Sequence, residues 1–289
     1  MPYTPGQVLG GMTVSLGTLL LGAVDSAGVA WYLGADGLQG WDAPDTRTQY
    51  ADRQADHGSW AGPTYLTSRV ITLAGTVVAP SQAALDLALD QLSAACSLTD
   101  TLLTVGETVP KQAVVRRSGR PLMKRETNTI ASWSVMVTAA DPRRYSTVLQ
   151  TASTGLPTAG AGISLPITLP VVIPAGTASG QLTLTNAGSI STRPVFTITG
   201  PVTTPTILVQ YPDSTVRQLV YSDTLNLGDV LTIDTDTHSV VLSGPVSRRR
   251  YLSGTWPEVP LTSSVTVQWT AASYDPAALL TATCRSAWM

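Results

Sequence analysis

One stretch of the chain, Thr129–Ser146 (TIASWSVMVTAADPRRYS), constrains the fold more than any other. The segment alternates between two sets of residues, which is the two-residue period of a β-strand with two unlike faces. One set is Ile130, Ser132, Ser134, Met136 and Thr138, and the other is Ala131, Trp133, Val135, Val137 and Ala139. Asp141-Pro142 then ends the strand, because proline cannot donate to a ladder and restricts the residue before it. Arg143, Arg144 and Tyr145 follow at once. The segment therefore predicts a long strand with a sharp, cationic end.

Turn residues divide much of the remaining chain into short apolar runs. Runs of this length, bounded by Gly, Pro, Asp and Asn, are typical of β-sandwiches and barrels. The expected strands are Val70–Val78, Leu102–Val105, Gln112–Arg116, Gln181–Leu184, Val195–Thr199, Ile207–Val209, Val216–Tyr221, Val230–Ile233, Ser239–Leu242 and Ser264–Trp269. In the second half, turns at Asn226–Asp229 and Asp234–His238 predict hairpins.

One segment, residues 81–96, has the helical pattern instead. Its apolar residues recur every three or four positions on one face, and Ser81 is a suitable N-cap. A weaker helical period occurs near Pro276–Cys284. The chain is therefore expected to be mainly β, with an α+β first half that is a β-sandwich with one helix and a second half that is a β-sandwich of about eight strands.

The length of 289 residues allows two domains of ordinary size. The stretch Gln150–Ser164 consists mostly of small, uncharged residues, a composition that is typical of a flexible linker. We therefore predict a first domain over residues 1–150, a linker over 151–164 and a second domain over 165–289. The apolar run Met12–Val24 has no Lys or Arg before it, so it is expected to be a buried strand pair broken at Gly17 or Gly22 rather than a signal peptide.

Charged residues make up only 12% of the chain, against about 25% in typical globular proteins. This predicts that partner subunits bury much of the surface. The net charge of −2 gives no reason to expect specific nucleic-acid binding, and no membrane insertion is predicted because Met12–Val24 is too short to span a bilayer. The two cysteines, Cys96 and Cys284, are expected to be buried free thiols, with a disulfide between them left open.

No motif in the sequence predicts catalysis, a metal or a cofactor. His57 and His238 lack the context of an activated nucleophile and are expected in a loop and a turn. Glutamate occurs three times only, which disfavours a glycosidase carboxylate pair. Asp234 and Asp236 imitate the start of a calcium loop but lack the Gly and distal Glu, so a hairpin turn is favoured.

Two basic segments and the tryptophans are candidate interaction sites. Six cations lie within fifteen residues around Ser118-Gly119, which we interpret as a hairpin tip contacting an acidic protein partner rather than as a solvated edge. Arg248–Arg250 fits a second contact or an exposed loop equally. Trp133 and Trp269 are expected in the core. The predicted protein-interface residues are Arg116, Arg117, Arg120, Lys124, Arg125, Arg143 and Arg144, joined by Lys111 in the basic cluster and by Trp31, Trp41 and Trp60 as exposed or interface residues.

The order of several motifs resembles the distal tail proteins of long-tailed bacteriophages. They are GWDAP at Gly40–Pro44, RQADHG at Arg53–Gly58, RVITLAG at Arg69–Gly75, DPRRY at Asp141–Tyr145, LTLTNAG at Leu182–Gly188, PVFTITGP at Pro194–Pro201, GDVLTID at Gly228–Asp234 and RSAW at Arg285–Trp288. The likeness covers nearly the whole chain. The inserted binding modules of larger members are missing, which favours a hub role over direct receptor binding.

The resemblance implies a virion structural protein of the tail tip, synthesised in the bacterial host cytoplasm. Its first half would form a homo-oligomeric, usually hexameric, ring, and its second half a peripheral jelly-roll or galectin-like sandwich. The implied partners are other copies of the chain, the tail tube protein and the hub, fibre or other baseplate proteins, with cell-surface carbohydrate left open. A free-standing carbohydrate-binding or adhesin module is the alternative, and a hydrolase would require a site that the sequence does not contain.

Overall fold

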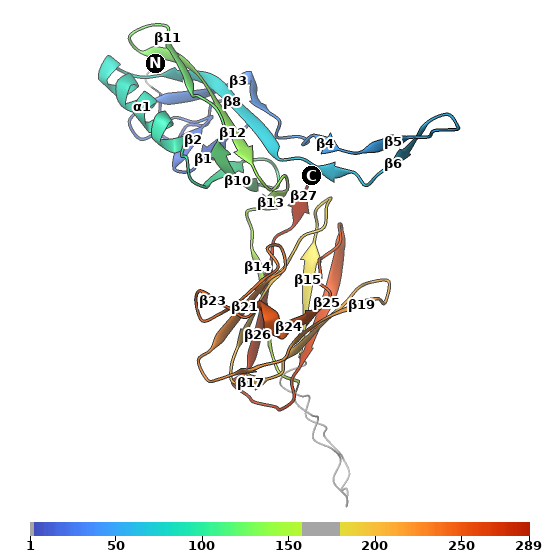
Figure 1. The fold of residues 1–289 in the computed structure, drawn as a ribbon. Helices are drawn as coiled ribbons and strands as arrows, with labels where there is room; N and C mark the ends of the chain where they lie inside the picture. Colours follow the sequence, from blue (N-terminus) through green and yellow to red (C-terminus); the bar gives the residue numbers. More distant parts are fainter. Residues whose placement is uncertain (1–2, 158–179) are drawn as a thin grey trace, which may run out of the picture. The chain divides into compact units, whose positions relative to one another are not determined.

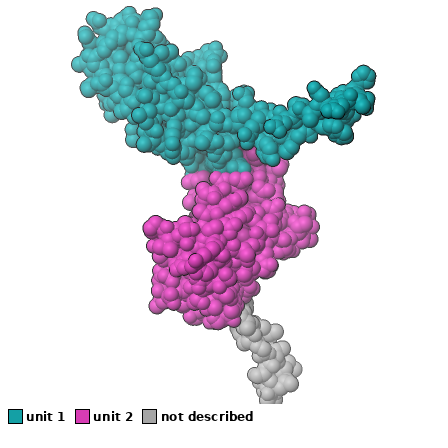
Figure 2. Space-filling view, in the orientation of Figure 1, with its two compact units in different colours: residues 1–147, 289 teal, residues 148–288 magenta. Residues whose placement is uncertain are grey.

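The structure is a computed structural model that describes residues 3–157 and 180–289. The chain divides into unit 1, Met1–Thr147 with Met289, and unit 2, Val148–Trp288 (Figure 2). Within the described residues both units are mostly β and α1, Gln82–Ala95, is the one α-helix (Figure 1). The mainly β fold predicted from the sequence is confirmed.

Unit 1 is built on one large sheet with the strand order β2-β1-β9-β10-β12-β8-β3, with β11 beside β12 and β13 beside β10. Its centre is the antiparallel pair β8 and β12, which is in register over ten residues from Arg69↔Ala139 to Val78↔Ile130. The strand bounds are β1 Val14–Leu16, β2 Leu19–Leu21, β3 Ala30–Gln39, β8 Arg69–Val78, β9 Thr101–Val105, β10 Lys111–Arg117, β11 Leu122–Arg125, β12 Ile130–Ala139 and β13 Arg144–Ser146. The predicted pair within Met12–Val24 is confirmed as β1 and β2.

The alternation in β12 arises because one face of the sheet is covered. Trp133, Val135 and Val137 are buried in a core with Leu85 and Leu92 of helix α1. The Ser81 hydroxyl accepts a hydrogen bond from the Ala84 amide at 3.2 Å, which confirms the predicted N-cap.

Close packing explains one of the motif glycines. A Cβ on Gly75 would lie 1.9 Å from the Tyr32 carbonyl oxygen and 3.0 Å from Cζ2 of Trp133. A larger residue at this position would therefore push β3 away from β8.

Between β3 and β8 the chain forms a long two-stranded arm, residues 46–66, that extends from the sheet of unit 1 (Figure 1). Strands β4, Thr46–Arg47, and β7, Tyr65–Leu66, pair at its base. Strands β5, Tyr50–Asp52, and β6, Ser59–Ala61, pair further out. The arm is almost wholly exposed, and no buried residue lies within it.

Unit 2 is a β-sandwich of two sheets with a shared apolar core. One sheet has the order β14-β26-β16-β21-β22-β23, the other β15-β25-β18-β19-β24, and β17 pairs with β20. The bounds are β14 Gln150–Gly155, β15 Gln181–Asn186, β16 Val195–Thr199, β17 Val202–Thr203, β18 Thr206–Gln210, β19 Val216–Tyr221, β20 Thr224–Leu225, β21 Val230–Asp234, β22 Ser239–Leu242, β23 Val246–Ser247, the 3₁₀ turn η1 Arg249–Tyr251, β24 Leu252–Gly254, β25 Ser263–Thr270, β26 Leu279–Cys284 and β27 Ala287–Trp288.

Three local predictions for this half are wrong. Residues 151–155 of the expected linker belong to β14, which pairs with β26, and residues 158–164 lie outside the described part. The segment with a weak helical period near Pro276–Cys284 contains the strand β26. Asn226–Asp229 is a turn but not a hairpin, since β20 and β21 on either side of it lie in different sheets. The turn Asp234–His238 does join paired strands, β21 and β22.

Candidate protein interface

The motifs at residues 40–44, 69–75 and 141–145 meet in a polar network inside unit 1. Arg69 is fully buried and donates from Nε to the Pro142 carbonyl at 2.9 Å. Its Nη1 donates to the carbonyls of Trp41 at 2.7 Å and Gly40 at 3.2 Å. Burial, and next the charge of Arg144, lower the pKa of Arg69 to about 10, so it remains protonated at neutral pH.

Glu107 is the anionic centre of the same region. It accepts a hydrogen bond from Nε1 of Trp41 at 2.5 Å, pairs closely with Lys111, and lies 3.9 Å from Nη1 of Arg144. The Arg144 guanidinium also lies 5.5 Å from the centre of the Trp41 ring. Burial opposes ionisation, but the hydrogen bonds from Lys111 and Trp41 outweigh it, so the pKa of Glu107 is below its usual value.

The DPRRY segment is held by its own aspartate. Asp141 accepts hydrogen bonds from the Arg143 amide at 3.1 Å and from the Tyr145 hydroxyl at 2.5 Å, and Nη1 of Arg143 lies 3.5 Å from it. Burial and the neighbouring Asp141 raise the pKa of Tyr145, which keeps its hydroxyl a donor. Arg143 and Arg144 therefore stabilise unit 1 internally, and their predicted contact with another protein stays a prediction.

The basic segment around Ser118-Gly119 has a different geometry from the one predicted. Strands β10 and β11 do not pair with each other but follow one another along the same edge of β12. Arg117 is opposite Val137 and Leu122 is opposite Ser134, so residues 118–121 form a bulge rather than a hairpin tip. The hairpin prediction at this position is wrong, because β12 supplies the partner strand.

Most cations of this segment have intramolecular partners. Arg116 pairs with Asp100, Arg125 with Asp86, Lys124 with Glu126 and Lys111 with Glu107. Within the described part of the chain, Arg117 and Arg120 make no ion pair, and they line a shallow hollow with Leu98 and Pro121. The predicted interface role therefore falls most directly on Arg117 and Arg120, and it remains a prediction.

The arm exposes three large aromatic side chains, of which only Trp60 is predicted from the sequence as an exposed residue. Tyr50, Trp60 and Tyr65 are 68%, 66% and 57% exposed. The Arg53 guanidinium lies 4.5 Å from the centre of the Trp60 ring, and Arg47 lies 5.6 Å from that of Tyr65. An isolated two-stranded hairpin is marginally stable in water, which makes this arm a candidate for contact with a partner.

The predictions for the tryptophans are confirmed for three residues and wrong for two. Trp133 and Trp269 are core residues as expected, and Trp60 is exposed as expected. Trp31 and Trp41 are buried at 0% and 5% exposure, so their prediction as exposed residues is wrong. Their Gly- and Asp-rich surroundings favour a surface, but the Trp31 ring packs edge to face against Trp133 in the core, and Trp41 belongs to the Arg69 network.

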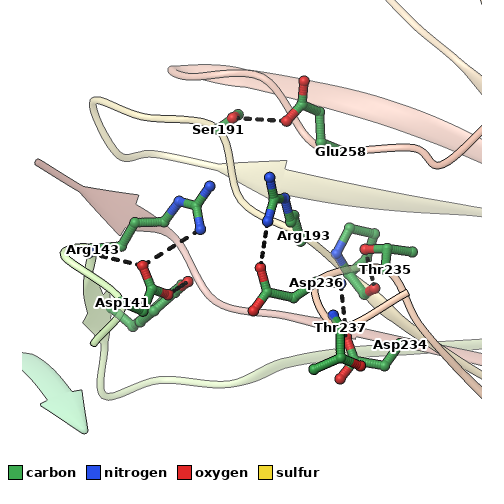
Figure 3. A network of polar contacts seen from close by, with 11 residues as sticks. Asp141, Arg143, Ser191, Arg193, Asp234, Thr235, Asp236, Thr237 and Glu258 are labelled. Carbon is green, nitrogen blue, oxygen red and sulfur yellow. Dashed lines mark hydrogen bonds and ion pairs between the residues drawn. The ribbon is translucent and has the colours of Figure 1, made fainter. Parts of the chain in front are cut away.

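The turn between β21 and β22 matches its predicted structural role (Figure 3). Asp234 Oδ1 accepts hydrogen bonds from the amides of Asp236 at 2.8 Å and Thr237 at 3.3 Å, and the Asp236 carboxylate lies 2.6 Å from Nη1 of Arg193. Across residues 3–157 and 180–289, no three His, Cys, Asp or Glu residues lie together as a metal site.

The remaining sequence predictions concern the cysteines and histidines. Cys96 and Cys284 are free and buried as expected, and burial raises the pKa of each thiol to about 11. His57 lies near the tip of the arm and His238 in a turn. None of the helices described is long and apolar enough to span a bilayer.

Together these features define a class of protein: a mainly β chain with a one-helix β unit that carries an exposed arm, followed by a β-sandwich. No protein-family model matches the sequence, and no curated protein is similar to it in sequence. The fold is similar to the solved Dit protein (gp 19.1) of SPP1, described as a hub adsorption apparatus in phages that infect Gram-positive bacteria. The TM-score is 0.57 at 13% identity, over 89% of this chain and 94% of that one.

Chains of the phage p2 baseplate in its activated conformation also match, with Sr at a TM-score of 0.47 and with Ca at 0.45. Both are 12% identical and are covered over 99% of their length, against 91% of this chain. The SPP1 similarity spans most of the chain and shows a shared Dit-like fold. The resemblance to distal tail proteins found in the sequence is thus confirmed for the fold.

Proposed function

We propose that this chain is a non-enzymatic structural protein of a phage tail tip. It forms a ring that joins the tail tube to hub, fibre or other baseplate proteins. The observation that carries the proposal is the Dit-like fold over 89% of the chain, shared with a protein described as a hub of an adsorption apparatus. The resemblance implies six copies in the ring.

The arm of unit 1 supports self-assembly on physical grounds. Three large aromatic side chains, Tyr50, Trp60 and Tyr65, are more than half exposed on three short strands of the arm, which has no apolar core. Burial of apolar surface is the main driving force of association, at about 25 cal/mol per Å². A ring needs a heterologous interface, in which a surface of one copy contacts a different surface of the next. An arm that extends from the sheet is suited to such a contact.

The charge-poor composition agrees with this assignment, because 12% charged residues is low for a chain that stays alone in water. The carbohydrate-binding alternative is less favoured. Its stacking platform would need open tryptophan faces in the sandwich, but Trp269 is buried and the ring of Trp256 is stacked with His238.

Light scattering coupled to size exclusion, with negative-stain microscopy, tests the ring on the full chain. We expect wild-type protein to form rings whose mass is a multiple of 30.2 kDa. The triple substitution Tyr50→Ser, Trp60→Ser and Tyr65→Ser should give folded monomers, since these side chains pack against no core of their own copy.

The matched control replaces two exposed apolar residues of unit 2, Leu227→Ser and Tyr274→Ser, and should still form rings. A wild-type chain that stays monomeric at high micromolar concentration, without rings by microscopy, would contradict the proposal. The non-enzymatic part fails if purified protein cleaves cell-wall polysaccharide or peptide and one Asp or Glu substitution abolishes the cleavage.

A further inference from the structure

Unit 2 carries a group of arginines stacked on aromatic rings at one edge of its sandwich. We call this the arginine–aromatic cluster, defined as His238, Arg248–Arg250, Tyr251 and Trp256. Arg249–Tyr251 form the 3₁₀ turn η1, directly after the edge strand β23. The side chains of Arg249 and Arg250 are exposed.

Trp256 orders one side of the cluster. The His238 ring stacks on it with centroids 4.6 Å apart and planes at 18°. The Arg249 guanidinium lies 5.0 Å from the same ring, and its Nη1 donates to the Leu252 carbonyl at 2.8 Å. Arg217 donates from Nη1 to the Trp256 carbonyl at 2.9 Å, which fixes the backbone below the ring.

Tyr251 orders the other side. The Arg250 guanidinium lies 4.6 Å from the Tyr251 ring and donates from Nη2 to its hydroxyl at 2.6 Å. Arg248 lies 5.5 Å from the same ring. Each cation–π contact is weak at an exposed site, so it restricts the side chain but leaves most of its N–H donors unused.

Three other arginines of unit 2 pair with carboxylates, which separates them from Arg249 and Arg250. Arg193 pairs with Asp236, Arg217 with Glu258 at 3.9 Å, and Arg248 with Asp223 at 4.0 Å. In the described ranges of the chain, Arg249 and Arg250 have no carboxylate partner. A guanidinium has five N–H donors, and the contacts of these two residues engage one donor each.

We propose that Arg249 and Arg250 form a docking surface for an acidic segment of another protein. The planar guanidinium fork matches a carboxylate in a bidentate geometry, and stacking on Trp256 and Tyr251 reduces the entropy lost on binding. Val246 of β23, three residues before Arg249, is 52% exposed and offers an apolar contact beside the charges.

Other anionic or polar ligands fit the cluster less well. A phosphate polymer gains affinity from many released counterions, and two free arginines supply few. A sugar ring needs an open aromatic face, whereas His238 and Arg249 both occupy the ring of Trp256. The inference concerns unit 2 and does not depend on ring formation by unit 1.

The test uses the full chain and a short fluorescein-labelled peptide of alternating Asp and Val, followed by fluorescence anisotropy at about 150 mM salt. Wild-type protein should bind it saturably. The variant Arg249→Ser with Arg250→Ser should raise Kd at least about tenfold, since two charge-assisted contacts are lost.

The matched control, Arg116→Ser with Arg125→Ser, removes the same charge from arginines that already have carboxylate partners. Its Kd should stay within about twofold of wild type. If the serine variant at the cluster does not fold, Arg249→Lys with Arg250→Lys supplies the test. It keeps the charge but not the fork, and should bind at least about threefold more weakly.

Three results would overturn the proposal. The first is the absence of saturable binding by the wild-type chain. The second is an equal loss of binding in the control, which would mean that net charge alone attracts the peptide. The third is polyphosphate of the same total charge competing more strongly than the unlabelled peptide, which would assign the surface to a phosphate polymer instead.

Discussion

Unit 1 uses arginine in two opposite ways. Arg69 lies fully inside the unit and donates to the carbonyls of Gly40, Trp41 and Pro142. Arg116 and Arg125 lie on the surface, in ion pairs with Asp100 and Asp86 that water surrounds. Because both sites use arginine, the difference in solvent exposure decides how much the charge contributes to the stability of the fold.

The physical reason is the free-energy cost of removing a hydrogen-bond or ion-pair partner, which differs between buried and exposed sites. A buried carbonyl that loses its donor has no water to replace it, which costs about 1–3 kcal/mol per group. An exposed ion pair is exchanged for hydration and typically contributes little. Arg69 therefore ties together three distant parts of the sequence, whereas the ion pairs of Arg116 and Arg125 contribute little to the stability of unit 1.

The largest expected effect comes from Arg69→Met. We expect it to lower the free energy of unfolding of unit 1 by about 3 kcal/mol or more, because buried carbonyls lose their donor. Hydrogen exchange of peptides in β8 and β12 across a urea titration measures this change without interference from unit 2. The matched control Arg47→Met, on the arm, should unfold at the wild-type midpoint. A wild-type midpoint for Arg69→Met would remove the distinction between the two groups.

A smaller effect that depends on pH is expected at Glu107. Its lowered pKa means that the folded state holds the carboxylate more strongly than the unfolded chain does. The contribution is fully present above the usual glutamate pKa of about 4.3 and is lost as the pH falls through the lower folded value.

Glu107→Gln should therefore melt below wild type at neutral pH, and the difference should shrink as the pH falls below about 4.3. Melting curves from neutral to acidic pH measure this difference in melting temperature. The control is Glu258→Gln in unit 2, which should leave the hydrogen exchange of β9 and β10 in unit 1 unchanged. A difference that stays constant over this range would show that Glu107 acts through packing and not through its charge.

The smallest effect on folding is expected in the basic segment. Arg116→Ser, Arg117→Ser and Arg120→Ser together should leave the melting temperature nearly unchanged, since these side chains are exposed. They should impair assembly with neighbouring tail subunits, most visibly at raised salt, where the remaining attraction is screened.

The structure sharpens this prediction. Arg117→Ser with Arg120→Ser should reproduce most of the assembly defect, because these two have no ion pair to lose within the described chain. Arg116→Ser alone, which breaks the pair with Asp100, should have little effect. Complete tails at wild-type yield across salt concentrations would instead make the segment a solvated edge of the sheet.

Local patterns were sufficient for the elements themselves. Strand β12 and helix α1 were predictable, because a period of two residues, or of three to four, reflects which face of one element is covered. The β1–β2 pair was predictable from an apolar run that Gly17 interrupts. The two-residue period also carried a signal for Arg69, which shares its face of β8 with Ile71 and Leu73 and so had to be buried with partners. The density of cations along the chain does not reveal this residue, because Arg69 lies far from the basic segment in the sequence.

The amino-acid sequence by itself determined the mainly β character, helix α1 and an order of motifs that resembles distal tail proteins. Only the tertiary structure decided which strands are neighbours, because pairing depends on residues far apart in the chain. Strand β11 continues along β12 instead of turning back on β10, and residues 151–155 become β14 because β26 offers them an edge. The contrast between Trp41 and Trp60 has the same cause. Arg69 and Glu107 hold Trp41 inside unit 1, whereas Trp60 lies on an arm without a core and stays 66% exposed.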